Sequence, residues 1–184
     1  GFSEIIAEDL LPPESRHRYR EYARDIRSSG RHLLEVINQG LDMAKIEARR
    51  FEPRDEPLDM TELAESALRT MEPAAREAGV SVTSRLQPSL PRLSADRRAL
   101  RQVLLNLLSN AIKFTPRDGK VELSLSLDPE GAMVIAVSDT GIGMTPEEIP
   151  VALAPFGQID SAMTREKAGT GLGLPIVKST AEAH

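Results

Sequence analysis

Hydrophobic positions repeat with a helical period over the first part of the chain. Residues 1–11 have the pattern of a helix end, which Pro12 and Pro13 interrupt. From about His17 to Arg49, apolar positions recur at alternating spacings of three and four, which predicts one long helix. Its apolar seam comprises Tyr19, Tyr22, Ile26, Ser29, Leu33, Val36, Gly40 and Met43. A single helix cannot bury this seam, so the pattern predicts a helical hairpin that a second copy closes into a four-helix bundle.

The pattern changes to mixed helix and strand after residue 50. Residues 51–60 hold two prolines among charged residues and read as an extended linker. The elements predicted beyond it are a helix over 61–79 capped by Thr61 and Glu62, strands over 80–84 and 93–95, a helix over 97–113, a hairpin of strands over 120–127 and 133–138, a loop-rich region over 139–168 and a helix over 172–183. Helices on one side of an antiparallel-rich sheet make an α+β fold, an α/β sandwich. The predicted domains are therefore a helical segment over 1–50, a linker over 51–60 and an α/β domain over 61–184.

Composition excludes several kinds of protein. Hydrophobic residues make up 40% of the 184 residues and aromatic residues only 3%, so the core must be aliphatic. A net charge of -5 argues against a nucleic-acid partner, because no basic stripe is present to displace counterions. The chain has no cysteine, which excludes disulfides and thiolate metal sites. No apolar run approaches the roughly 18 residues that span a bilayer, so we expect no membrane segment here and a cytoplasmic location, with anchoring of a longer parent protein left open.

Three polar side chains in the helix over 97–113 suit a bound nucleotide. Asn106, Asn110 and Lys113 are spaced i, i+4 and i+7, so they share one face over two turns. Amide oxygens beside an ammonium suit a magnesium-bound triphosphate, because magnesium takes oxygen ligands and keeps several waters. The alternative is an amphipathic helix whose polar face meets solvent.

Two glycine-rich motifs offer further nucleotide contacts. Asp139 follows an apolar strand and precedes Gly141 and Gly143, where a carboxylate can accept from a purine amine and glycine allows close approach. The alternative is a simple Asp-Thr-Gly turn. The run Gly169–Leu174 opens the last helix and can bind phosphate through backbone N–H groups, or it can be a plain glycine hinge. It fits neither the dinucleotide-binding fingerprint nor a Walker A loop.

The segment over 155–165 has the composition of a lid. The segment is polar, Gly157 and Gly169 can act as its hinges, and Phe156 can anchor it. Arg165 and Lys167 give it two basic side chains. The alternative is a long surface loop.

Four motifs in order resemble a known family. QVLLNLLSNAIKFT, DTGIGM, PFGQID and GTGLGLPIVK resemble the N, G1, F and G2 boxes of bacterial sensor histidine kinases. That family shares the Bergerat (GHKL) ATP-binding fold with DNA gyrase, mismatch-repair ATPases and the large heat-shock chaperones. Residues 17–50 resemble the second helix of the family's dimerisation and phosphoacceptor domain.

The resemblance implies a site for ATP and Mg²⁺. It implies that Asn110 coordinates magnesium, with Asn106 beside it as a second metal ligand, and that Phe114 lies near the base or ribose. It implies that Lys113 contacts the phosphates and that Asn106 and Lys113 are the catalytic residues. It implies that Asp139 binds the adenine amine, in a pocket shaped by Gly141 and Gly143. The lid and phosphate contacts would come from Phe156, Gly169, Thr170, Gly171, Leu172 and Gly173.

The resemblance also implies an activity and partners. The expected reaction is transfer of the ATP γ-phosphate to a histidine, for relay to the receiver domain of a response regulator, in a homodimer. The family's acceptor histidine precedes the position of Gly1 by about eleven residues, so we expect this chain to bind ATP without holding the acceptor. His17, His32 and His184 are expected to be solvated or packing side chains and not reactive ones. The family also continues beyond His184 with a glycine pair and two strands.

Two other functions stay open at this point. Hydrolases of the same fold carry a glutamate where this chain has Asn106, and an amide cannot act as a general base. A pseudokinase or scaffold would keep ATP binding without transfer, and the residues that precede Gly1 would distinguish it from a kinase.

Overall fold

The computed structural model describes residues 1–12, 15, 17–47, 54–159 and 169–184. The chain divides into two compact units, Gly1–Ala44 and Lys45–His184, and each is described by itself. Residues 48–53, which include most of the predicted junction between helix and linker, lie outside the described residues.

The first unit is helical, as predicted. A short helix α1 (Phe2–Ala7) precedes the long helix α2 (His17–Glu47). The Phe2 ring stacks on Tyr22 with centroids 4.6 Å apart, and the Leu11 N–H donates to the Tyr19 hydroxyl over 2.8 Å. Two residues of the predicted seam therefore hold the N-terminal turn, while Ile26 and Leu33 further along α2 stay exposed. No helix in the described part of the chain is long and apolar enough to cross a membrane.

The second unit contains two sheets. Strands β2 (Ser81–Leu86), β4 (Lys120–Leu127) and β5 (Met133–Asp139) form a three-stranded sheet in that order. The β4–β5 pair is antiparallel, as the predicted hairpin requires, whereas β2 runs parallel to β4. The sheet is therefore mixed rather than antiparallel-rich, because the helix between β2 and β4 returns the chain to the same end of the sheet.

Part of the predicted linker belongs to the α/β domain. Strand β1 (Asp55–Leu58) pairs antiparallel with β3 (Leu93–Asp96). Leu58 is fully buried and Met60 is 1% exposed at the start of the next helix. The extended conformation of this segment agrees with the prediction, but its residues pair and pack, which a connecting linker does not. Pro57 is compatible with β1 because the two-stranded sheet leaves its other edge unpaired.

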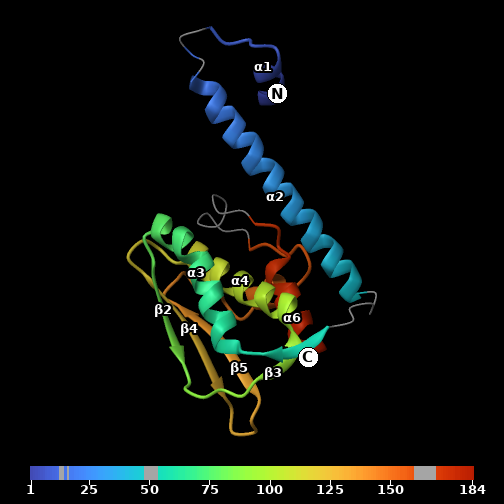
Figure 1. The fold of residues 1–184 in the computed structure, drawn as a ribbon, viewed down its shortest axis with the longest axis vertical. Coiled ribbons are helices and arrows are strands. Elements are labelled where there is room, and N and C mark those ends of the chain that lie inside the picture. Colours follow the sequence, from blue (N-terminus) through green and yellow to red (C-terminus); the bar gives the residue numbers. More distant parts are fainter. Residues whose placement is uncertain (13–14, 16, 48–53, 160–168) are drawn as a thin grey trace. The chain divides into compact units, whose positions relative to one another are not determined.

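Helices cover one face of the three-stranded sheet (Figure 1). Helices α3 (Met60–Ala78) and α4 (Arg97–Phe114) pack on the sheet, and α6 (Gly173–Ala183) packs against α4. A short helix α5 (Glu148–Ala152) lies within the region predicted to be loop-rich. The largest fully buried side chains include Leu104, Leu108, Leu123 and Leu125. The α/β sandwich and its aliphatic core are thus confirmed.

Short-range signals set the ends of these helices. The α3 N-cap is Asp59, whose carboxylate accepts from the Glu62 N–H over 3.1 Å, so the predicted cap at Thr61 is wrong by two residues. Gly79 ends α3 in the left-handed conformation, at φ 69°. Asp96 caps α4: one carboxylate oxygen accepts from the Arg98 and Ala99 N–H groups over 2.8 and 3.0 Å.

Removal of the Asp96 carboxylate is expected to destabilise the fold in a pH-dependent way. Burial by itself raises the pKa of Asp96, but hydrogen bonds from the Arg54, Ala99 and Arg98 N–H groups and the charge of Arg98 lower it below its usual value. A lowered pKa stabilises the fold above the unfolded pKa, and this is lost as pH falls through the folded pKa. Asp96→Ala should lower the unfolding free energy by about 1 kcal/mol at pH 7.

Urea unfolding at a series of pH values checks this expectation. The difference between the native chain and Asp96→Ala should shrink as the pH falls below about 4. Glu147→Ala is the matched control, because Glu147 occupies the N-cap position of α5 without a side-chain capping bond. An equal difference at pH 7 and pH 3 would show that the carboxylate charge is not what stabilises the cap.

Candidate functional site

The polar face of α4 is held in place by the opposite, apolar face. Val103, Leu104, Leu108 and Ile112 are buried, so the helix cannot rotate about its axis. Asn106 is only 8% exposed, and Asn110 and Lys113 are partly buried. The predicted spacing therefore brings three polar side chains to one partly covered face.

These side chains meet the glycine turn over 169–173. A Cβ added to Gly173 would lie 3.7 Å from Asn106 Cγ and 3.7 Å from Asn110 Nδ2. A Cβ added to Gly169 would lie 2.8 Å from Lys113 Nζ. Residues about 60 positions apart in sequence thus form one surface of amides, an ammonium and glycine backbone. Helix α6 begins in this turn, and its first N–H groups, those of Gly173 and Leu174, have no partner within the helix.

The glycine turn is shaped by close backbone contacts. Gly171 has φ 68°, and a Cβ there would lie 2.6 Å from the Phe156 carbonyl carbon. The Gln158 side chain donates from Nε2 to the Gly169 carbonyl oxygen over 2.8 Å. Phe156 itself has φ 60° and is 65% exposed. The glycine turn therefore contacts the segment of Phe156 and Gln158, while the predicted lid residues Arg165 and Lys167 lie outside the described residues.

Asp139 ends β5 beside the C-terminus of α4. One Asp139 oxygen accepts from the Gly141 N–H over 2.8 Å, and the Ile142 N–H donates to the Phe114 carbonyl oxygen over 3.3 Å. A Cβ added to Gly141 would lie 2.7 Å from that Phe114 oxygen, so only glycine allows this approach. A carboxylate has about four acceptor positions, so Asp139 can still accept from a ligand. Gly143 follows with φ 67°, in an exposed part of the loop.

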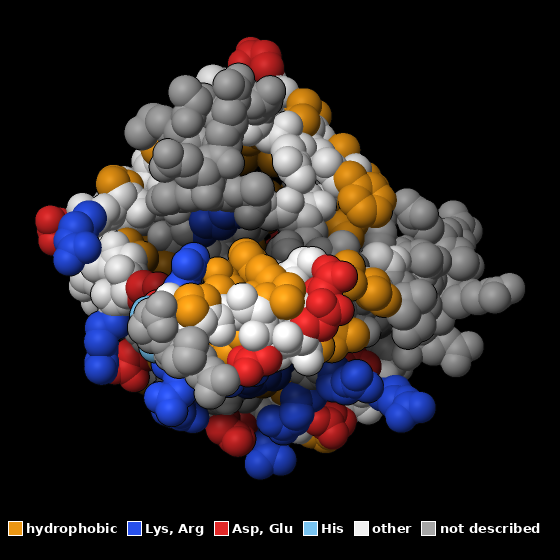
Figure 2. Space-filling view, turned by 90° about the horizontal axis from the view of Figure 1, so that it is seen from above, with side chains coloured by type: hydrophobic (Ala, Val, Ile, Leu, Met, Phe, Trp, Pro, Cys, Tyr) orange, Lys and Arg blue, Asp and Glu red, His pale blue; other side chains and the backbone are white. Residues whose placement is uncertain are grey.

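The donor set fits a magnesium ion that comes with phosphates. The part of the chain that the structure describes holds no group of three or more His, Cys, Asp or Glu able to bind a metal alone. Magnesium bound by one or two protein oxygens takes its other ligands from phosphate and water, which the amides of α4 allow. On the face shown in Figure 2, acidic and basic side chains are interspersed, without one broad patch of a single charge.

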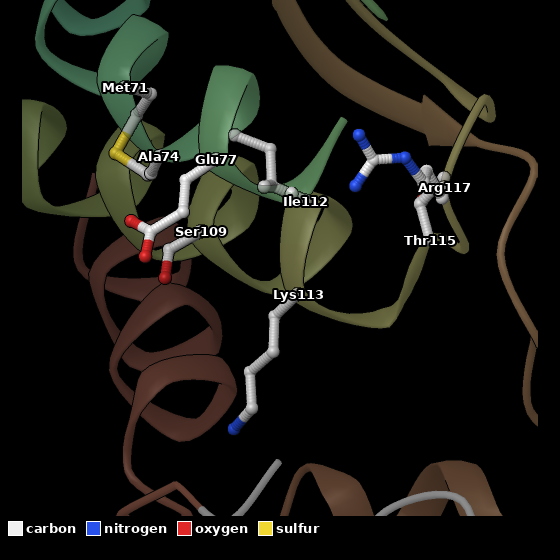
Figure 3. A pocket seen from close by; sticks show the side chains of 9 residues that line it. Met71, Ala74, Glu77, Ser109, Ile112, Lys113, Thr115 and Arg117 are labelled. Atoms are coloured by element: carbon white, nitrogen blue, oxygen red, sulfur yellow. The ribbon is translucent and has the colours of Figure 1, made fainter. Parts of the chain in front are cut away.

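A groove between two helices adjoins this site. It has a volume of about 630 Å³ and runs between α3 and α4, with Met71, Ala74 and Ile112 on its apolar side. Figure 3 shows the Lys113 side chain extending away from the other lining side chains. The Lys113 ammonium lies 4.9 Å from the centroid of the Phe114 ring and close to Gly169, where an added Cβ would be 2.8 Å from Nζ.

Several contacts at the site were not predicted. Gln102 donates from Nε2 to Asn106 Oδ1 over 2.9 Å, although its i, i+4 spacing from Asn106 was a visible signal. Thr115 is 2% exposed, and a Cβ on Gly119 would lie 2.3 Å from its methyl group. No local sequence pattern predicts the close contact of Gly119 with Thr115, because this contact depends on how the chain turns after α4.

The histidines that the structure describes serve structural roles or lie in solvent. His17 is exposed on α2. The His184 ring accepts from the Asp96 N–H through Nε2 over 3.2 Å and contacts the Thr180 carbonyl oxygen through Nδ1 over 2.9 Å. The His32 side chain is not among those that the structure describes, so the expectation for His32 stays a prediction.

Known proteins share this sequence and fold. Residues 95–184 match the family described as histidine kinase-, DNA gyrase B- and HSP90-like ATPase. The chain is 42% identical over 193 residues to the cell-division control histidine kinase PdhS of Brucella abortus, an alignment covering 100% of the chain and 19% of PdhS. It spans about a fifth of the length of the curated relatives that it matches.

Two solved structures are similar to this chain in fold as well as in sequence. ShkA, crystallised at full length in complex with AMPPNP, is 34% identical with a TM-score of 0.76, covering 90% of this chain and 34% of ShkA. The mycobacterial sensor histidine kinase MprB is 30% identical with a TM-score of 0.58, covering 71% of this chain and 80% of MprB. The chain belongs to the sensor histidine kinases.

Proposed function

We propose that this chain binds ATP with Mg²⁺ and donates the γ-phosphate to a histidine. The observation that carries the proposal is the convergence of Asn106, Asn110 and Lys113 on the glycine turn over 169–173. An ammonium and helix N-terminal N–H groups facing one small region suit a group of high negative charge. The AMPPNP bound to ShkA, which is 34% identical, supports the same nucleotide class here.

We assign the contacts as follows. Asn110 supplies a side-chain oxygen to magnesium, and Lys113 neutralises phosphate charge. Asp139 accepts from the adenine amine, with Gly141 and Gly143 shaping that pocket and Phe114 beside the base or ribose. Contacts with the phosphates and with a closed lid come from Phe156, Gly169, Thr170, Gly171, Leu172 and Gly173. Asn106 was predicted as a second magnesium ligand, and its hydrogen bonds are considered below.

Transfer of a phosphate group requires the protein to position the reactants and to neutralise negative charge. Asn110 would hold magnesium, which when bound would supply positive charge to offset that of the phosphates. The ammonium of Lys113 would hold the terminal phosphate near the start of α6, and the N–H groups there would stabilise charge on its oxygens. The apolar side chains Ile142 and Met144 are exposed beside the Asp139 loop, where they can cover the base.

The proposal also includes the acceptor of the phosphate group and the protein partners, which lie outside this chain. We place the phosphoacceptor histidine on the helical segment of the parent protein, with relay to a response-regulator receiver domain. The exposed apolar side chains of α2, which include Ile26, Leu33 and Ile37, support homodimerisation through this helix. The proposed setting is the cytoplasm, where ATP is available.

Hydrolysis is the weaker candidate. Activation of water requires a general base beside the phosphate, and the corresponding position holds the buried amide of Asn106. No titratable side chain occupies that position of α4.

The Asp139→Asn variant tests the nucleotide assignment. The Gly141 N–H requires an acceptor, so the single oxygen of asparagine stays with it and the NH₂ group faces the adenine amine. We expect the affinity for Mg·AMPPNP to fall roughly 10- to 100-fold by calorimetry. Asp128→Asn is the control, because Asp128 accepts backbone N–H groups in the distant β4–β5 turn. Unchanged affinity in Asp139→Asn would remove Asp139 from the adenine pocket.

A further inference from the structure

A chain of two hydrogen bonds joins α4 to the start of α6. Gln102 donates from Nε2 to Asn106 Oδ1 over 2.9 Å. Asn106 donates from Nδ2 to the carbonyl oxygen of Gly173, the first residue of α6, over 3.2 Å. The site assigned above uses the surface beside these bonds but gives Gln102 no part.

The direction of both bonds follows from the final acceptor. A peptide carbonyl can only accept, so Asn106 must turn its NH₂ group toward Gly173. Asn106 Oδ1 then faces Gln102, whose NH₂ group is the one that can donate to it. Gln102 therefore selects the orientation of the Asn106 amide that holds α6.

Because Asn106 is buried, a wrong orientation of its amide would cost much free energy. Asn106 is 8% exposed, so water cannot readily replace a lost partner, and an unpaired buried amide is costly. A Cβ on Gly173 would be in ordinary contact with both Asn106 and Asn110, which places the first residue of α6 directly against the two amides. A shift of α6 would therefore move the glycine turn relative to Asn110 and Lys113.

We propose that Gln102 is a positioning residue for the phosphate end of the nucleotide site. Gln102 fixes the amide of Asn106, Asn106 fixes the Gly173 carbonyl, and the start of α6 fixes the distance from the glycine turn to Asn110 and Lys113. The inference rests on the proposed function, since it concerns phosphates bound at that turn. On this assignment Asn106 acts by holding α6, not by ligating magnesium.

Two substitutions of Gln102 separate hydrogen bonding from shape. Gln102→Met keeps the length of the side chain but removes the donor. Gln102→Glu keeps the shape but presents only acceptors to Asn106 Oδ1, so it should be the more damaging. In the 184-residue chain, we expect the affinity for Mg·AMPPNP to fall roughly tenfold in Gln102→Met and further in Gln102→Glu. The affinity for adenosine, which has no phosphate, should stay unchanged in an NMR titration.

Arg101→Met is the matched control. Arg101 precedes Gln102 on α4 but bonds to another helix, donating to Ser66 Oγ and Thr70 Oγ1 on α3 over 3.0 and 3.2 Å. Its loss should lower thermal stability without changing the AMPPNP affinity. Hydrogen exchange of the hydrogen-bonded amides of α6, beginning with the Ile176 N–H that donates to the Leu172 carbonyl oxygen, should quicken in the two Gln102 variants and not in the control.

The outcomes distinguish this inference from the proposed function. If the native chain binds neither AMPPNP nor adenosine, the proposed function fails. If the native chain binds and Gln102→Met binds Mg·AMPPNP equally well, the positioning role is refuted. An equal loss of AMPPNP and adenosine affinity would also refute it, because that result means a general structural effect.

Discussion

Replacement of Asn110 with alanine is expected to abolish magnesium-dependent nucleotide binding and, in a longer protein that includes the acceptor, phosphate transfer. Asn110 lies on α4 beside Gly173, and we propose that its side-chain oxygen ligates the metal. Loss of one preorganised group at a reacting phosphate typically costs roughly 100-fold in rate. The measurements are calorimetry with AMPPNP, with and without Mg²⁺, and incorporation of labelled phosphate from ATP.

Ser109→Ala is the control for this substitution. Ser109 is the preceding residue on α4, is exposed, and lines the groove between α3 and α4 instead of the glycine turn. It should keep native binding and transfer. If Asn110→Ala bound Mg·AMPPNP with undiminished affinity and transferred phosphate normally, the assignment of the metal ligand would be wrong.

The second large effect is expected from Gly171→Ala. A methyl group there would lie 2.6 Å from the Phe156 carbonyl carbon, and φ 68° disfavours any side chain. The clash is with backbone, so relief requires the glycine turn or the Phe156 segment to move. We expect nucleotide affinity to fall at least about tenfold, because the turn would leave the position set by α4 and α6. Helical content by circular dichroism should be retained.

Gly131→Ala separates the steric effect from backbone strain. Gly131 also has a positive φ, 86°, but no atom lies within 4 Å of a Cβ there. This variant should lose about 1 kcal/mol of stability from the strained backbone alone and bind nucleotide normally. Equal nucleotide affinity in the two glycine variants would show that the turn over 169–173 does not need its observed shape.

Local sequence patterns were sufficient for most elements of the α/β domain. The helix that carries Asn106, Asn110 and Lys113 was predicted over 97–113 and observed over Arg97–Phe114. The strands of the β4–β5 hairpin were predicted because alternation of apolar and polar residues and the Asp128–Gly131 turn are short-range signals. The ends of such elements depend on hydrogen bonds within a few residues.

The pairing of strands that are remote in sequence could not be predicted from the sequence. Residues 55–58 looked like a linker because Pro57 and the neighbouring charges give a weak strand pattern, yet they pair with β3 about 40 residues later. The parallel pairing of β2 with β4 was likewise hidden, because it depends on the crossover through α4. Neither pairing has a local signal, since each strand's partner is remote in sequence.

The sequence alone determined the family and the chemical inventory of the site, because four motifs with fixed spacing supply the amides, the ammonium, the carboxylate and the glycines. Tertiary structure decided how they meet. Only packing of α6 on α4 brings Gly173 against Asn106 and Asn110, and only burial of Asn106 makes its bonds to Gln102 and Gly173 a means of positioning. The physical reason is that residue type sets which bonds a side chain can make, whereas burial and the approach of remote segments set which of those bonds form.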